Sequence, residues 1–213
     1  ARAIVFGKVS NQRVLVQRHA EGAAWAGRAL ASMDQMRRQV DAAANLDELR
    51  GREGLAAREY FSLLRQILRP PADGKAWGFE KRAYYPPTDP LNALLSFGYT
   101  LLLNDLVAAC QLTGLDPDLG FFHVIDYNKP AMALDLEEIF RAVIVDSIVL
   151  TAVNRPYFSL RDFEIGKPLK DAEENDPSPE SLPARPSLAK LVADAPVRTV
   201  YMKDAARRRF IDL

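Results

Sequence analysis

Apolar side chains recur every three or four residues along much of the chain, a spacing that places them on one face of a helix. The clearest run lies between residues 25 and 68, which are also rich in the strong helix formers Ala, Leu, Arg, Glu and Met. Its apolar positions include Leu30, Met33, Met36 and Val40. This pattern predicts a protein built mainly from helices.

Polar and glycine residues mark where helices in this run should begin and break. Asn45 and Asp47 can cap a helix, because their side-chain oxygens accept hydrogen bonds from its first free backbone N–H groups. Gly51 and Gly54 then interrupt the pattern. We expect the helix to resume over residues 56–68.

Proline marks the start of the next helix. Thr88 or Asp89 can act as its cap because Pro90 follows, and proline is favoured at the first helical position. We expect this helix to run to about Thr113 and to end at Gly114.

The second half of the chain alternates apolar and breaker-rich segments. A strongly apolar stretch, residues 134–153, ends at Asn154. Six prolines and a dense acidic run lie within residues 166–196, and this composition predicts a mobile insertion. The chain should be helical again from Lys203 onward.

Two segments stay undecided on pattern alone. Residues 2–18 fit a strand through the alternation of Val14 and Val16, but they also fit a helix face through Ile4 and Lys8. Residues 77–85 are aromatic and basic, without a clear period.

Composition is that of one ordinary globular domain. The chain has 213 residues, 48% hydrophobic and 26% charged, which excludes disordered, collagen-like and disulfide-rich classes. Its single cysteine, Cys110, cannot form an internal disulfide and favours a cytoplasmic location. No stretch reaches about 18 uninterrupted apolar residues, so no membrane span is expected. Because the sequence begins without Met, we expect it to be a segment of a longer chain.

Charge is unevenly distributed although the total is zero. Residues 1–85 carry a net charge of +6, residues 86–150 carry −7 and residues 151–213 carry +1. A basic first part beside an acidic middle fits a surface for a polyanion next to a cation site. A chance distribution of surface charge fits equally well.

Carboxylates and one histidine are the candidate chemistry. Asp135 and Glu138 are three residues apart, so a helix would project both from one side. Its apolar face would carry Leu136, Phe140, Val143 and Ile144, which places Glu138 at the edge of the core. A carboxylate there must be paired, protonated or bound to a cation. A salt bridge between Glu138 and Arg141 is the competing interpretation.

A third acidic residue lies between two glycines. Small residues at Gly51 and Gly54 would let another helix or a DNA backbone approach Glu53 closely; an exposed Glu53 at a helix crossing is the alternative. Gly-x-Ser-x-Gly, phosphate-binding glycine loops and Cys-x-x-Cys are absent from the sequence. Carboxylates with His123 therefore point to a divalent-metal site.

Four segments carry a specific resemblance in their order and spacing. They are Leu49–Phe61, Asp89–Leu102, Gly114–His123 and Ala133–Arg141, with shorter matches at Asn11-Gln12 and Asn154-Arg155. They resemble the motifs of the CRISPR-associated integrase family, the universal first Cas subunit. The resemblance covers residues from about 8 to 165 and again from Val200.

The resemblance implies an all-α catalytic domain without the family's amino-terminal β-rich domain. Residues 1–20 would be a linker or first helix leading from that domain, and residues 21–213 the helical catalytic domain, with the mobile insertion at 166–196. The family's metal ligands correspond to Glu53, His123 and Glu138. Asp135 would be a second catalytic carboxylate, and the ion would be Mn²⁺ or Mg²⁺.

The resemblance also implies a function: insertion of short foreign DNA fragments into a CRISPR array by transesterification. Implied partners are DNA (prespacer and repeat), a second copy in the full-length protein and a small ferredoxin-like second subunit. Candidate phosphate contacts are Arg37, Arg38, Arg52, Arg58, Lys81 and Arg82. The rivals are a non-catalytic helical scaffold that binds DNA or protein, and a metal-dependent hydrolase of small phosphates. Residues 123–130 lack the family's basic and glycine-rich character.

Overall fold

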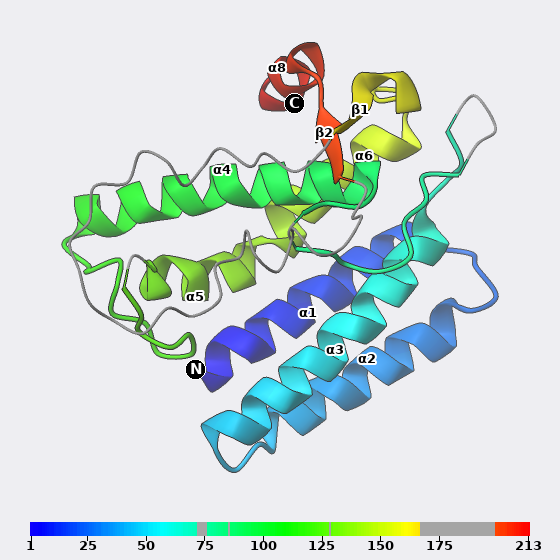
Figure 1. Cartoon of the computed structure of the whole chain (residues 1–213). Coiled ribbons are helices and arrows are strands. Elements are labelled where there is room, and N and C mark those ends of the chain that lie inside the picture. Colours follow the sequence, from blue (N-terminus) through cyan, green and yellow to red (C-terminus); the bar gives the residue numbers. More distant parts are fainter. Residues whose placement is uncertain (72–75, 85, 128, 167–198) are drawn as a thin grey trace.

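The computed structural model describes residues 1–71, 76–84, 86–127, 129–166 and 199–213. Within them the chain is mostly helical (Figure 1). The helices are α1 (Arg2–His19), α2 (Ala26–Asp41), α3 (Leu46–Ile67), α4 (Pro90–Thr113), α5 (Ala131–Phe140), α6 (Ser147–Asn154) and α8 (Asp204–Ile211). Shorter elements are the π-helical segment Ala142–Asp146, the 3₁₀ turn Leu160–Asp162 and the strands β1 (Phe163–Gly166) and β2 (Thr199–Met202). The all-α prediction is confirmed.

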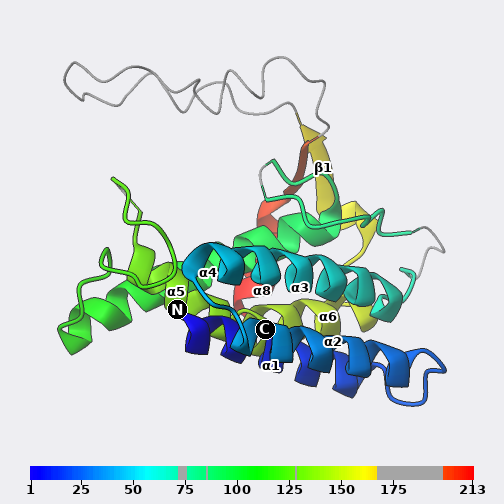
Figure 2. The same cartoon turned by 90° about the horizontal axis from the view of Figure 1, so that it is seen from below.

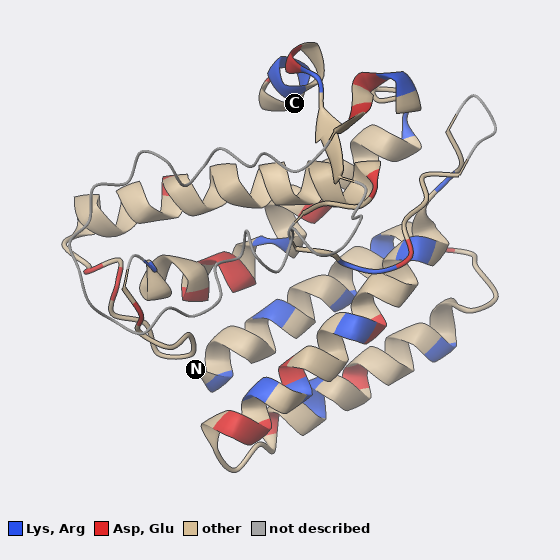
Figure 3. Ribbon diagram, viewed as in Figure 1, with Lys and Arg blue, Asp and Glu red and all other residues tan. Residues whose placement is uncertain are grey.

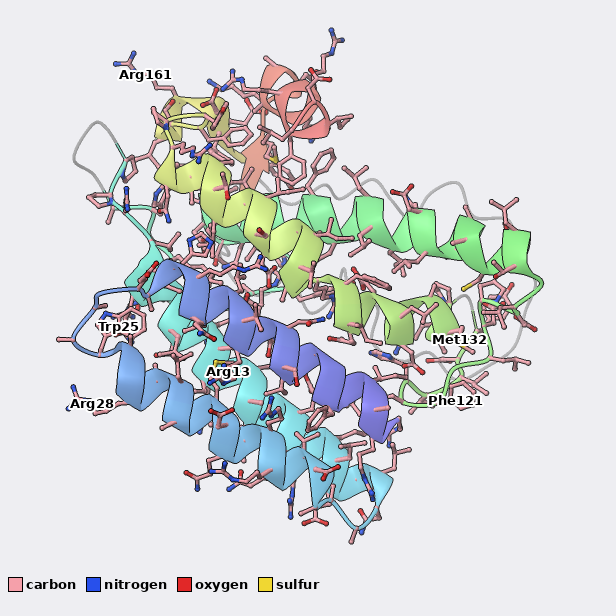
Figure 4. All side chains as sticks on the ribbon, turned by 180° about the vertical axis from the view of Figure 1, so that it is seen from behind. Arg13, Trp25, Arg28, Phe121, Met132 and Arg161 are labelled. Carbon is pink, nitrogen blue, oxygen red and sulfur yellow. The ribbon has the colours of Figure 1, made fainter. Side chains whose placement is uncertain are left out.

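Helices α1, α2 and α3 lie side by side, and α1 also packs against α5 (Figures 1 and 2). The ambiguous first segment is thus helical. Its buried residues Val5, Val9, Gln12 and Val16 recur at helical intervals, so one face of α1 enters the protein. Between α1 and α2, Arg13 forms an ion pair with Asp34 at 2.8 Å (Figure 4).

Helix α3 corrects one expectation from the sequence. It runs without interruption through Gly51 and Gly54, where we expected a break. Asn45 is its cap, as expected, and accepts a hydrogen bond from the backbone N–H of Glu48 at 2.9 Å. Glycine costs only about 1 kcal/mol in a helix interior, which the packing of a 22-residue helix outweighs.

Helix α4 confirms its predicted ends. Asp89 accepts a hydrogen bond from the backbone N–H of Asn92 at 2.9 Å, and Gly114 ends the helix at φ +76°. By length and mean hydropathy, 1.5 over its most apolar window, α4 could cross a membrane, although Asn92 and Asp105 interrupt its apolar run. The core helix of a globular protein passes the same test, and α4 packs against α5 and β2 here.

The apolar segment 134–153 also differs from expectation. It divides into α5, a π-helical segment and α6, and the apolar face predicted for it is partly solvent-exposed. Phe140, Val143 and Ile144 are 39%, 54% and 39% exposed. The prediction that this apolar face is buried was therefore wrong, whereas Glu138 does lie on the core side, as predicted.

Polar side chains occupy the inward side of this segment. They are Asp135, Glu137, Glu138 and Asp146, each at most 5% exposed. Their burial is possible because they have partners on other helices. Glu138 pairs with a lysine of α1, and Asp146 accepts hydrogen bonds from tyrosine hydroxyls of α3 and α4, which offsets the free-energy cost of burying the charge. The π-helical segment, with its wider turn, separates Asp146 from the others.

The described strands form a two-stranded antiparallel sheet. Strands β1 and β2 pair with Phe163 opposite Met202, and α8 follows, as the sequence predicted for the end of the chain. The main core includes Leu91, Leu94 and Leu150. Nearly all of the predicted mobile insertion, residues 167–196, lies outside the described residues, and the proposed domain boundaries stay predictions.

Candidate metal centre

Four parts of the chain bring the candidate site together. Lys8 lies on α1, Glu53 on α3 and Glu138 on α5, while His123 lies in the loop between α4 and α5. That loop approaches α5 closely at Gly120, where a Cβ atom would lie 2.7 Å from the Ala131 carbonyl. Figure 4 shows the labelled Phe121 of this loop near Met132, at the start of α5.

Asp135 fixes the orientation of His123. One carboxylate oxygen lies 2.7 Å from the imidazole Nδ1, and the same side chain accepts backbone N–H groups from Phe121, Phe122 and His123. Burial would raise the pKa of Asp135, but these donors outweigh it and the pKa is lowered. An ionised Asp135 accepts a hydrogen bond from Nδ1–H, which in the neutral imidazole leaves the lone pair on Nε2. That Nε2 lies 3.9 Å from Glu138 Oε1.

Lys8 joins the two glutamates. Its ammonium forms an ion pair with Glu53 and a second one with Glu138 Oε2 at 2.6 Å. Burial would lower the pKa of Lys8, yet Glu138 and Glu53 outweigh burial and raise it. Because one ammonium contacts both carboxylates, Glu53 and Glu138 are neighbours although 85 positions separate them in the sequence.

Arg141 is the second cation that pairs with the carboxylates of this cluster. It donates to Glu138 Oε1 at 2.7 Å and to Glu137 Oε2 at 2.6 Å, and its guanidinium stacks on the Tyr99 ring. The competing interpretation, a salt bridge between Glu138 and Arg141, is thus part of the structure. Burial would raise the pKa of Glu138, but Lys8 and Arg141 outweigh burial and lower it.

The donor set of this cluster fits a divalent cation. It offers carboxylate oxygens from Glu53 and Glu138 and an imidazole nitrogen whose other nitrogen is held by a carboxylate, an arrangement typical of metal-bound histidine. Glu138 Oε2 is buried without a hydrogen bond and has only the ion pair with Lys8. Among the described residues, no three acidic, histidine or cysteine side chains are arranged as a ready-made metal site. The ion pairs of Lys8 and Arg141 hold the carboxylates instead.

The structure places the predicted DNA contacts in three kinds of environment. Arg38, Arg58 and Lys81 are exposed. Arg37 and Arg52 already have partners: Arg37 pairs with Asp34 at 3.5 Å, and Arg52 bonds to Glu48 and the Gln39 carbonyl. Arg82 donates hydrogen bonds to Asn92 Oδ1 at 2.9 Å and Ser96 Oγ at 3.0 Å, so its guanidinium already has partners within the protein. Figure 3 shows that Lys and Arg follow α1, α2 and α3.

Two residues that contact the site, Lys8 and Arg50, were not predicted from the sequence. The helical spacing of Lys8 with buried Val5 and Gln12 could have indicated that Lys8 is buried. Arg50 donates to the Phe122 carbonyl at 2.9 Å and ties α3 to the histidine loop. Nothing in the sequence indicated that contact, which joins residues 72 positions apart.

Another buried carboxylate, that of Asp146, lies next to this cluster. Asp146 accepts hydrogen bonds from the Tyr60 and Tyr99 hydroxyls at 2.6 and 2.5 Å. Burial raises the pKa of Asp146, and the two hydroxyls only partly offset that effect. Tyr99 also contacts Arg141, so this network supports the helix that carries Glu138.

Comparison with known proteins gives a consistent result. The profile of the family described as CRISPR associated protein Cas1 matches residues 1–170. The chain is 42% identical to the CRISPR-associated endonuclease Cas1 1 of Moorella thermoacetica, over 76% of this chain and 49% of that protein. It is 44% identical to the CRISPR-associated endonuclease Cas1 2 of Rhodospirillum rubrum, over 76% of this chain and 50% of that protein. The chain thus spans about half the length of these relatives.

A solved structure agrees with the fold. A chain of the partial Cas6-RT-Cas1–Cas2 complex superposes with a TM-score of 0.78 at 26% identity, over 99% of this chain and 54% of that one. The helices that bring Lys8, Glu53 and Glu138 together are thus arranged as in a chain of a Cas1-containing assembly. With the profile and the relatives, this places the chain in the family of the CRISPR-associated protein Cas1.

Proposed function

We propose that the chain is the catalytic part of a divalent-metal-dependent DNA endonuclease and integrase, which inserts short foreign DNA fragments into a CRISPR array. One observation carries the proposal: Glu53, His123 and Glu138 come from α3, a loop and α5 to adjoining positions. Their residue types suit Mn²⁺ or Mg²⁺. The relatives' names as Cas1 endonucleases support it.

Glu53, Glu138 and His123 Nε2 would hold the cation. When bound, it would polarise the scissile phosphate and stabilise charge on the attacking or leaving oxygen. Asp135 keeps the His123 ring in one orientation with Nε2 free. Arg141 keeps one oxygen of Glu138 in place. In transesterification the 3′-hydroxyl of the DNA fragment attacks, so no side chain has to be the nucleophile.

The proposed partners are the prespacer and repeat DNA, a second copy of the full-length protein and a small ferredoxin-like subunit. The superposed chain belongs to a complex of Cas1 with Cas2, which supports the last of these. The excess of Lys and Arg over residues 1–85, a net charge of +6, supports a polyanionic ligand near α1 to α3. A cytoplasmic location stays a prediction, as does the placement of an amino-terminal domain before residues 1–20.

The alternative is a non-catalytic scaffold of the same fold. One observation favours it: Lys8 pairs with Glu53 and Glu138, and Arg141 also pairs with Glu138, so both carboxylates have cationic partners without a metal. A scaffold would bind DNA or protein equally well after loss of the candidate ligands. Their substitution therefore separates the two functions.

Strand transfer by the full-length protein with its small partner, in Mn²⁺, tests the proposal. We expect Glu53→Gln and His123→Ala each to lower the rate by more than the roughly 10–100-fold typical of residues that only support a ligand. Glu59→Gln is the matched control on the same helix, because its carboxylate accepts a hydrogen bond from the Ser32 hydroxyl at 3.2 Å and belongs to no ion pair among the described residues. Unchanged strand transfer in both ligand variants would establish the scaffold.

A crystal soaked in Mn²⁺ tests the ligand set directly. We expect one anomalous peak within coordination distance, about 2.0–2.6 Å, of Glu53, His123 and Glu138. A peak that touches other residues instead would assign the cation to a different site.

A further inference from the structure

Lys8 is the one member of the cluster that the proposed reaction leaves without a role. Its side chain is 9% exposed, and its ammonium lies between Glu53 and Glu138, 2.6 Å from the second. Lysine is almost never buried to this degree unless it is paired. The pairing explains how the ammonium is tolerated there, but not why a lysine stands at this position.

The position of the ammonium matters because of what else would bind there. A cation held by Glu53 and Glu138 must lie within about 2.0–2.6 Å of an oxygen from each. Lys8 Nζ already contacts an oxygen of each carboxylate. A divalent cation bound through these same two oxygens would overlap with the ammonium and would be repelled by its charge, so the two would compete for this space.

Resting on the metal centre proposed above, we propose that Lys8 is a built-in competitor of the divalent cation. Its ammonium pairs with Glu53 and Glu138 and offsets part of their negative charge while the site holds no metal, and it moves aside when the cation binds. Lys8 thereby sets how tightly the site holds metal, and it keeps the two carboxylates together beforehand.

The structure offers the displaced ammonium another partner on the same helix. Gln12 lies one turn further along α1, is 4% exposed, and its Oε1 accepts no hydrogen bond. Side chains on a helix lean toward its amino-terminus, so Gln12 leans toward Lys8. A buried acceptor without a donor is costly, and the ammonium of Lys8 would satisfy it.

Lys8→Met tests the proposal, because methionine keeps much of the apolar stem and removes the charge. In calorimetric titration with MnCl₂ and no DNA, we expect this variant to bind Mn²⁺ at least tenfold more tightly than the unaltered chain. Its metal-free form should unfold at a lower temperature, since buried Glu138 and partly buried Glu53 lose their shared cation. Mn²⁺ should then raise that temperature by more than in the unaltered chain.

Two further variants serve as controls. Lys8→Arg keeps a cation at the position and should retain the weaker affinity for Mn²⁺. Lys203→Met removes an exposed lysine, whose ammonium donates to the Arg161 carbonyl at 2.8 Å, and should leave both measurements unchanged. A gain in affinity in Lys203→Met would mean that net charge alone is responsible, which would overturn the proposal.

The remaining outcomes are equally decisive. If Lys8→Met is unfolded without metal, the proposal requires circular dichroism to show that excess Mn²⁺ folds it; a variant that stays unfolded overturns the proposal. Equal or weaker Mn²⁺ binding by folded Lys8→Met also overturns it while leaving the metal centre intact. Failure of the unaltered chain and of the variant to bind millimolar Mn²⁺ would overturn both the metal centre and the role of Lys8.

Discussion

The two carboxylates one turn apart on α5 differ in what their oxygens already bind. Both oxygens of Asp135 are used, by three backbone N–H groups and by His123 Nδ1. Glu138 has one oxygen on Arg141, whereas its Oε2 has only the ion pair with Lys8. Glu138 is therefore the carboxylate available to a metal, and Asp135 positions His123.

This difference predicts unlike effects of the two substitutions. Glu138→Ala removes a charged ligand and should abolish strand transfer at any Mn²⁺ concentration. Asp135→Asn should leave activity lowered about 10–100-fold, partly restored by excess metal, because the amide still holds the His123 loop. Strand-transfer rates across a Mn²⁺ titration measure both. Rescue of Glu138→Ala by metal, with Asp135→Asn inactive, would reverse the two roles.

Residue types and their spacing predicted only part of this site. The four residues Glu53, His123, Asp135 and Glu138 were candidates from the sequence, yet their convergence came from family resemblance, not from periodicity. Lys8 could not be assigned, because its partners are 45 and 130 positions away. Such pairings depend on how α1, α3 and α5 pack, and no local pattern records that.

At the scale of elements, helix caps were predictable and helix faces were not. Asn45, Asp89 and Gly114 end helices through local hydrogen bonds, so the sequence nearby is sufficient. The inward face of α5 was misjudged, because tertiary ion pairs make its carboxylates the buried side. Glycine was misjudged in α3 for a related reason, since packing of the whole helix outweighs a small local cost.

Glycines in two helices should respond in opposite ways to alanine. At Gly98 of α4 a Cβ atom would lie 2.5 Å from Val145 Cγ1 and 3.0 Å from Phe210, and valine has little rotamer freedom to yield. We expect Gly98→Ala to lower the free energy of unfolding by about 1–3 kcal/mol. Urea denaturation measures this change.

Gly51→Ala is the matched control in α3. No neighbouring atom lies within 4 Å of a Cβ atom built there, so we expect a gain of about 0.5–1 kcal/mol in the free energy of unfolding. Equal effects at Gly51 and Gly98 would contradict the close packing of α4 on the π-helical segment. The open space at Gly51 also shows that no described helix packs closely there, and the approach of a DNA backbone stays a prediction.

At the scale of the whole molecule, the helices α1 to α3 differ in charge from the helices α4 and α5. Lys and Arg follow α1 to α3, and acidic residues predominate around α4 and α5 (Figure 3). The sequence already contained this contrast, as a net charge of +6 over residues 1–85 against −7 over residues 86–150. What it could not indicate is that some of these cations are committed, as Arg82 is to Asn92 and Ser96.

DNA should therefore follow the surface of α1 to α3, and neighbouring arginines on α2 test this path. Replacing Arg37 and Arg38 with Ala should weaken binding to unrelated DNA duplexes to the same extent. It should also reduce the slope of log K against log salt concentration by about 1–2, because fewer counterions are released from the DNA when phosphate contacts are lost. Arg207→Ala with Arg208→Ala is the matched control on α8. There too the first arginine has an aspartate three residues earlier, Asp204, as Arg37 has Asp34. Equal losses in both pairs, measured by fluorescence anisotropy across a salt titration, would show that attraction depends on net charge and not on this surface.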